Sequence, residues 1–265
     1  MGVITGFTDL DHILKGGLQK GCLYVLAARP SIGKTTLAIH MADYICLKEH
    51  RTVAFFSLEN SRRQVIDRIL ALESGIDPYC IFTGRINRKD WHRIAEAAET
   101  IGKSNLVIDD SYCIDVHKLR TRCLEYRREN EDLAAIFIDY LQLISGSEEK
   151  ESREEEALEV VTSLKDLARE LDRPIVVLSQ ISRSVEHRED HRPTLSDFFP
   201  GKTISQYFDG VMFLYRDEYY NKDSERKGIA EVIVAKNPMG PVGVVELGYQ
   251  APYVKFTNFS FANQY

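Results

Sequence analysis

Short apolar runs rich in β-branched and aromatic residues recur along the chain, and stretches with helical periodicity lie between them. Strand-sized runs that alternate with helical stretches are typical of parallel βαβ units, so the pattern predicts an α/β fold with a largely parallel central sheet flanked by helices. The expected strands span residues 23–27, 52–56, 106–108, 134–138, 175–178 and 211–214. The expected helices lie near residues 35–47, 62–74, 89–101, 116–130 and 154–171.

The pattern changes toward the C-terminus. Three apolar runs at residues 229–235, 242–247 and 253–256 follow one another with short turns, which predicts an antiparallel C-terminal edge of the sheet. Two charged stretches, residues 145–156 and 186–192, are expected to be solvated, the first as a loop and the start of a helix. The chain contains no internal repeat or low-complexity tract, so a single domain over residues 1–265 is the simplest interpretation.

Composition excludes several classes of protein. Hydrophobic residues make up 44% and charged residues 28% of the chain, which is ordinary for a folded globular domain and argues against disorder. The chain shows neither an apolar stretch long enough for a membrane span nor the pattern of a secretory leader. A net charge of −6 argues against a generally basic surface that coats nucleic acid, but it leaves a local basic channel open.

The cysteines show no spacing that suggests a paired function. There are five, none in a CxxC pair or beside a histidine cluster, so we expect reduced thiols in a cytoplasmic protein and neither a disulfide frame nor a zinc site. They are Cys22, Cys46, Cys80, Cys113 and Cys123.

A phosphate-binding pattern lies between the first expected strand and the first expected helix. It consists of Ala28, Arg29, Pro30, Ser31, Ile32, Gly33, Lys34, Thr35 and Thr36. A strand, a loop and a Gly-Lys-Thr that opens a helix form the context of a P-loop, whose backbone N–H groups cradle phosphates at the positive helix end. We expect Lys34 to reach the β- and γ-phosphates of ATP, and the Thr35 hydroxyl to bind Mg²⁺. The strict pattern has glycine in place of Ala28, and a methyl group there requires backbone angles open to L-residues.

Three polar residues follow other expected strands. Asp139 ends an apolar strand in the manner of a Walker B motif, Glu59 follows the second strand, and Gln180 follows the fifth. Because ligands of open parallel sheets bind at the carboxyl ends of the strands, these side chains are expected beside the phosphate loop. Asp139 would hold Mg²⁺, Glu59 would act as the general base for the attacking water, and Gln180 would sense the γ-phosphate. The alternative for an acidic residue at a strand end is a simple helix-capping role, which applies more to Glu59 than to Asp139.

Taken together, the motifs resemble the motor domain of DnaB-type replicative helicases, a RecA-like P-loop NTPase. The matching stretches are Thr5-Gly6-Phe7, Asp9-Leu10-Asp11, Gly17-Leu18, the phosphate loop, Phe56-Ser57-Leu58-Glu59, Ile138-Asp139-Tyr140-Leu141-Gln142-Leu143, Leu178-Ser179-Gln180-Ile181-Ser182-Arg183-Ser184 and Arg192-Pro193-Thr194-Leu195-Ser196-Asp197. The resemblance covers nearly the whole chain and implies a hexameric ring that hydrolyses ATP between subunits and moves 5′-to-3′ along single-stranded DNA. A primase and a helicase loader are further partners that it allows.

The chain departs from the family pattern at two places. The family reads Lys-x-Arg-Asn-Gly where this chain has Lys236 and then Pro238, so Lys236 is expected to act on the neighbouring subunit's ATP while the arginine finger is missing. The DNA-facing loop is also altered, and Gly201, Lys202 and Thr203 are the residues expected to contact phosphates, with Arg183 as a link to DNA or to the next subunit. The alternative is that this loop no longer touches DNA.

Three functions therefore remain open at the level of sequence. The first is an ATP-driven helicase motor, which the intact phosphate loop and Asp139 favour. The second is a degenerate paralogue that binds ATP and regulates or assembles with a true helicase, which Pro238 favours. The third is a RecA- or KaiC-like ATPase with another task. The family's N-terminal helical domain and linker helix are not part of this sequence, either because the sequence is cut to the motor domain or because the natural gene lacks them.

Overall fold

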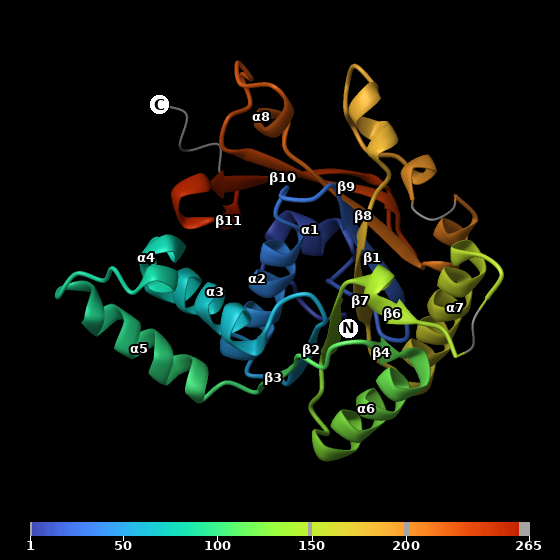
Figure 1. The fold of residues 1–265 in the computed structure, drawn as a ribbon, viewed down its shortest axis with the longest axis horizontal. Helices are drawn as coiled ribbons and strands as arrows, with labels where there is room; N and C mark the ends of the chain where they lie inside the picture. Colours follow the sequence, from blue (N-terminus) through green and yellow to red (C-terminus); the bar gives the residue numbers. More distant parts are fainter. Residues whose placement is uncertain (1, 148–149, 199–201, 260–265) are drawn as a thin grey trace.

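The computed structural model describes residues 2–147, 150–198 and 202–259, which build a nine-stranded sheet with helices on both faces (Figure 1). The strand order is β11-β10-β9-β8-β1-β7-β5-β2-β3. These strands are β1 (Leu23–Ala28), β2 (Val53–Ser57), β3 (Leu106–Asp109), β5 (Ala135–Asp139), β7 (Ile175–Gln180), β8 (Gly210–Tyr215), β9 (Ile229–Lys236), β10 (Gly243–Gln250) and β11 (Lys255–Asn258). A separate pair of short parallel strands consists of β4 (Ile114–Asp115) and β6 (Ile144–Ser145).

The two predicted halves of the sheet are both present. Strands β3, β2, β5, β7, β1 and β8 are parallel to one another, and β8, β9, β10 and β11 are antiparallel. All six residues of β1 are buried, because this strand lies between two parallel neighbours and helices cover both faces of the sheet. The prediction of a parallel sheet with an antiparallel C-terminal edge is therefore confirmed.

Different helices cover the two faces of the sheet. The helices are α1 (Thr8–Ile13), α2 (Lys34–Leu47), α3 (Arg62–Ser74), α4 (Pro78–Thr83), α5 (Asp90–Gly102), α6 (Val116–Glu129), α7 (Arg153–Leu171) and α8 (Asp217–Tyr220). Along β1, Tyr24 and Leu26 belong to the core shared with α2, whereas Leu23 and Val25 belong to the core shared with α7. Helices α3, α4 and α5 extend to one side of the sheet (Figure 1). None of the described helices has the length and apolar character that crossing a bilayer requires.

Local signals define several helix ends. Ser61 and Gln64 form a capping box at the start of α3, and Gly75 ends the helix in the left-handed conformation. Ser152 caps α7, and three glutamates in its first turn lie at the positive end of the helix dipole. These signals explain why the acidic stretch at residues 145–156 becomes helical from Arg153.

The prediction of a solvated loop at residues 186–192 is wrong in part. Arg188 binds Asp197 and Arg192 binds Glu231, and both carboxylates are buried. A buried carboxylate is costly unless a cation and hydrogen bonds accompany it, so these arginines are held against the fold and are only partly exposed to water. The five cysteines are unpaired in the structure.

Candidate nucleotide site

The phosphate loop connects β1 to α2 at the carboxyl edge of the sheet. Ala28 is the last residue of β1, so its methyl group lies on extended backbone and the glycine of the strict pattern is not required. Gly33 adopts φ 114°, and a Cβ there would lie 2.9 Å from Cζ of Phe256 on β11. The loop therefore approaches the C-terminal strand more closely than any side chain at position 33 allows.

The predicted phosphate and metal residues come together although they are distant in sequence. The Thr35 hydroxyl donates a hydrogen bond to Oδ2 of Asp139 at 2.8 Å. Lys34 is 8% exposed, and its Nζ lies 4.9 Å from the ring centroid of Tyr140, the residue after Asp139. Parallel pairing of β1 with β7, of β7 with β5 and of β5 with β2 brings these strand ends to one edge.

Burial sets the electrostatics of this cluster. Desolvation lowers the pKa of Lys34 and outweighs the opposing attraction of Asp139 and Glu59. Desolvation also raises the pKa of Asp139, although Lys34 and the Thr35 hydroxyl both favour its charged form. Two groups whose charged forms are disfavoured in the free protein gain most from an added ligand that carries compensating charge.

The residues fit a hydrated Mg²⁺ ion. Oδ1 of Asp139 is buried and is one of two buried side-chain atoms in the described residues that lack a hydrogen-bond partner. Such an atom is costly to bury without a partner, and a carboxylate oxygen beside a threonine hydroxyl is a donor set that suits Mg²⁺. With phosphates on the loop, Thr35 and Asp139 would hold the ion, whose charge would stabilise the phosphate oxygens.

The other two strand-end residues lie nearby but differ in their surroundings. Glu59 lies two residues beyond β2, and its side chain is exposed and close enough to Lys34 and Asp139 to influence their pKa values. Gln180 ends β7 directly opposite Ala28. Its N–H donates to Oε1 of Gln142, and Nε2 of Gln142 donates to its carbonyl. Gln142 follows Asp139 by three residues, so it connects the end of β5 to Gln180.

Two arginines connect the phosphate loop to neighbouring parts of the fold by hydrogen bonds. Arg29 donates to the carbonyl of Ile181 and to Glu186. Arg216, which follows β8, donates to the carbonyl of Ile32. The role of Arg216 was missed by sequence reasoning, because it lies 184 residues from its partner and no local motif marks it.

A cavity of about 300 Å³ opens beside the phosphate loop. Aromatic and apolar side chains form much of its wall, and Gln64, Asp67 and Arg68 of α3 add polar groups. Its lining residues are Thr36, Ile39, His40, Gln64, Asp67, Arg68, Leu72, Pro78, Tyr79, Phe82, Tyr253 and Val254. Because Thr36 belongs to the phosphate loop, a ligand bound by its phosphates has an adjacent space for a flat ring.

The residues expected to act on a neighbour or on DNA lie elsewhere. Lys236 pairs with Val211 near the start of β8, so it lies at the end of the sheet opposite its own phosphate loop. Its Nζ donates to the carbonyls of Gln206 and Phe208, and burial lowers its pKa. Arg183 and Thr203 are exposed. Gly201 lies outside the described residues, as does the side chain of Lys202.

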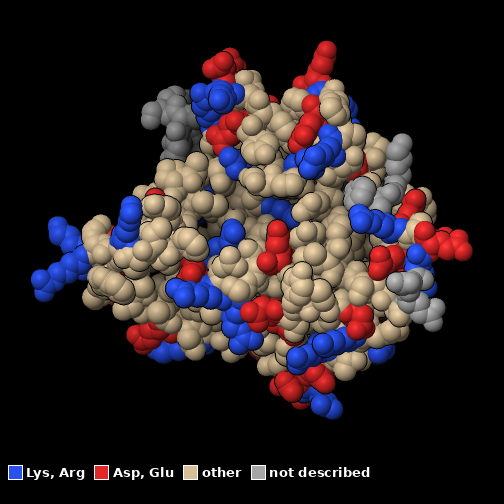
Figure 2. Space-filling model, viewed as in Figure 1, with Lys and Arg blue, Asp and Glu red and all other residues tan. Residues whose placement is uncertain are grey.

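Charged side chains of both signs are interspersed over the face of the molecule shown in Figure 2. No broad single-sign area dominates this face, which agrees with the net charge of −6. Contact of this face with a polyanion would therefore depend on local groups.

The comparisons with known proteins agree with this geometry. A family model described as the DnaB-like helicase C terminal domain matches residues 2–258. The replicative DNA helicase DnaB of Geobacillus stearothermophilus is 45% identical over 258 residues, which cover 97% of this chain and 56% of that protein. The replicative DNA helicase DnaC of Bacillus subtilis (strain 168) is 43% identical over the same share of each chain. The chain thus spans little more than half the length of these relatives.

Solved structures show the same fold. A DnaB-like replicative helicase, described with its interactions with primase, superposes with a TM-score of 0.94 at 36% identity, covering 98% of this chain and 62% of that chain. A solved ATPase domain of another protein also gives a TM-score of 0.94 at 36% identity, covering 98% of this chain and 92% of that chain. The fold class predicted from the sequence is therefore confirmed.

Proposed function

Since the chain belongs to the family of DnaB-like helicase C-terminal domains, we propose that it is the ATP-hydrolysing motor of a replicative helicase that moves on single-stranded DNA. The observation that carries this proposal is the cluster of Lys34, Thr35 and Asp139, in which one buried carboxylate oxygen lacks a partner. Mg²⁺ bound together with ATP supplies the missing partner, and such a complex uses the loop, the metal residues and the adjacent cavity at once.

Each residue of the cluster has a distinct task. Lys34 and the N–H groups at the start of α2 bind the phosphates, and Thr35 and Asp139 bind the metal. Glu59 is exposed toward solvent at the same edge, where a general base can reach a water molecule that attacks the γ-phosphate. The cavity beside Thr36 receives the base and ribose, with Tyr253 and Arg68 available for stacking.

Magnesium-dependent binding tests the nucleotide site. A fluorescent ATP analogue titrated with and without Mg²⁺ should bind the wild-type chain at least tenfold more tightly with the metal, a difference of about 1.4 kcal/mol or more. Asp139→Asn should lose this difference, whereas Asp166→Asn, on the exposed side of α7, should keep it. If Asp139→Asn retained the full magnesium effect, the metal assignment would be wrong.

Lys236 lies too far along the sheet to serve the phosphate loop of its own chain, so we propose that it serves the loop of a second copy. A ring of identical subunits places the same two surfaces at every interface, which a shared ATP site requires. Pro238 provides no donor, so this contribution to the transition state comes from Lys236 without an arginine finger. Single-stranded DNA would contact Arg183 and residues 201–203, and a primase remains a further predicted partner.

Subunit mixing tests the shared site. Lys34→Ala disables the phosphate loop of a subunit, and Lys236→Ala removes the lysine that the subunit would contribute to its neighbour's loop. Each variant alone should therefore be inactive in ATP turnover. An equal mixture should recover turnover at roughly a quarter of the interfaces, because those interfaces combine an intact loop with an intact lysine. A mixture that stays inactive, while both variants still associate with wild type, would show that Lys236 does not act between subunits.

A further inference from the structure

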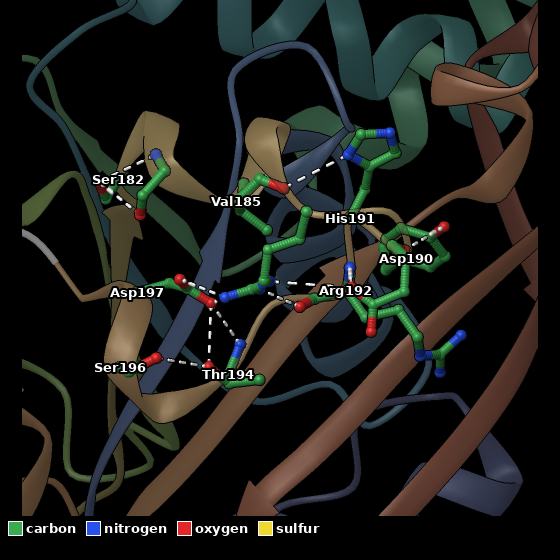
Figure 3. Close-up of polar contacts among 11 residues, drawn as sticks. Ser182, Val185, Asp190, His191, Arg192, Thr194, Ser196 and Asp197 are labelled. Atoms are coloured by element: carbon green, nitrogen blue, oxygen red, sulfur yellow. Dashed lines mark hydrogen bonds and ion pairs between the residues drawn. The ribbon is translucent and has the colours of Figure 1, made fainter.

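The segment from Ser182 to Phe198 is held as one unit against the sheet. The N–H of Ser182 donates to the carbonyl of Asp197 at 2.8 Å, which closes the segment at its base. Arg188 spans the interior with two hydrogen bonds to Asp197, at 2.9 and 2.8 Å. Figure 3 shows this network, with Thr194 and Ser196 beside Asp197 and with His191 directed at the carbonyl of Val185.

Ion pairs stabilise the contacts of this segment at neutral pH. Burial opposes ionisation of Asp197, but hydrogen bonds from Arg188 and Thr194 outweigh it, and the pKa of Asp197 lies below its ordinary value. A second ion pair, between Arg192 and Glu231, ties the segment to β9. We expect a segment with this many internal bonds to respond as one unit, because a change at one end strains the other.

The phosphate loop is joined to one end of this segment by hydrogen bonds and an ion pair. The N–H of Ile181 donates to the carbonyl of Ala28, and Nη1 of Arg29 donates to the carbonyl of Ile181 at 3.0 Å. Nε and Nη2 of Arg29 lie 2.9 and 2.8 Å from Oε1 of Glu186. The Arg29 side chain is 11% exposed and the Glu186 side chain 41%, so solvent screens this pair mainly from the Glu186 side.

The other end of the unit leads to the loop expected to face DNA. Phe198 pairs with Ile181 across a β-bridge and stacks on Phe208, with ring centroids 5.8 Å apart. Residues 201–203, which were predicted to contact phosphates, follow three residues later. The Arg29–Glu186 pair and Phe198 therefore belong to the same bonded segment, which ends three residues before the predicted DNA-contacting residues.

From these contacts we propose that Glu186 is a positioning residue that couples the phosphate loop to residues 182–198, an inference that rests on the proposed ATP-dependent function. Glu186 binds Arg29 and is not among the residues assigned to the phosphates or the metal. It fixes the Arg29 side chain, so that a change in the phosphate loop between ATP-bound and ADP-bound states shifts the segment. Gln142, three residues after Asp139, is hydrogen-bonded to Gln180, which lies two residues before this segment and gives the metal side of the site a second route to it.

Hydrogen–deuterium exchange tests the coupling without requiring turnover. The full chain is measured with Mg²⁺ and either ADP or a non-hydrolysable ATP analogue, and amides of residues 28–36 and 182–198 are followed separately. Wild type should show exchange in residues 182–198 that differs by roughly three- to tenfold between the two nucleotides, the range that the net contribution of one ordinary hydrogen bond gives. Glu186→Ala should lose that difference while keeping nucleotide-dependent protection of residues 28–36.

Two further variants make the result decisive. Glu189→Ala changes a carboxylate of the same segment for which the described residues show no hydrogen bond or ion pair, so it should behave as wild type. Glu186→Gln keeps the size of the side chain but not its charge, and should show a reduced difference. An undiminished difference in Glu186→Ala and Glu186→Gln would overturn the coupling. Absence of protection at residues 28–36 in wild type would instead refute the nucleotide site itself, and the coupling with it.

Discussion

Replacing Gly33 by alanine should lower the free energy of unfolding by about 2–6 kcal/mol. At φ 114° an L-residue is strained, which costs about 1–3 kcal/mol. The new Cβ would also lie 2.9 Å from Cζ of Phe256, which is packed edge-on against His40, and such overpacking costs about 1–3 kcal/mol more.

Urea unfolding monitored by circular dichroism measures this change. The matched control is Gly84→Ala at the end of α4, where φ is 70° and nothing lies within 4 Å of the added Cβ, so only about 1–2 kcal/mol is expected. In a Phe256→Leu background the steric part of the Gly33→Ala effect should shrink. If Gly33→Ala cost no more than Gly84→Ala, the close packing of the phosphate loop on β11 would be wrong.

Three other changes test charges in and near the site. Lys34→Ala should weaken binding of a fluorescent ATP analogue at least tenfold while circular dichroism shows an unchanged fold, and undiminished binding would remove the phosphate-loop assignment. Burial and neighbouring Glu73 raise the pKa of Asp43 to about 8, so the stability that its protonated form contributes is present below pH 4 and is lost as the pH rises to 8. In urea unfolding, Asp43→Asn should flatten this decline of the free energy of unfolding with pH. An unaltered dependence of that free energy on pH would contradict the assignment. Burial lowers the pKa of His40 to about 4, so stability should be lost as the pH falls from 6.5 toward 4, and His40→Gln should remove this loss; an equal acid sensitivity in both proteins would exclude His40 as its source.

The regular elements could be predicted because their signals are local. Helix α3 has its capping box at Ser61 and its terminal Gly75 within the sequence that forms it, and the predicted range of residues 62–74 is the observed one. Helices α1, α4 and α8 were not predicted. They span 6, 6 and 4 residues, too few for a helical period to show.

The candidate site divides in the same way. Lys34 and Thr35 lie in one motif, and Asp139 ends an apolar run, so their meeting could be inferred from the order of parallel strands. The contacts of Arg29 and Arg216 could not, because their partners lie 157 and 184 residues away and depend on the register of β7 and β8. At residues 186–192 the sequence led to a wrong prediction of a solvated loop. Its composition shows the charges of the arginines but not the buried carboxylates that they bind in the fold.

The predicted family resemblance is confirmed, and the roles of individual site residues remain predictions. The departure at Pro238 bears most directly on whether this chain hydrolyses ATP, because proline leaves Lys236 as the cation expected to reach the next subunit. The alternative of a degenerate paralogue rests on the same position.

ATP turnover by the purified chain, measured over a range of protein concentrations with and without single-stranded DNA, tests the central claim most directly. A motor that shares its site between subunits should hydrolyse ATP faster per chain as concentration rises and faster again with DNA, and Pro238→Arg should increase the rate further. Tight binding of ATP with no turnover at any concentration, restored only by Pro238→Arg, would contradict the account and identify a subunit that binds nucleotide without driving movement.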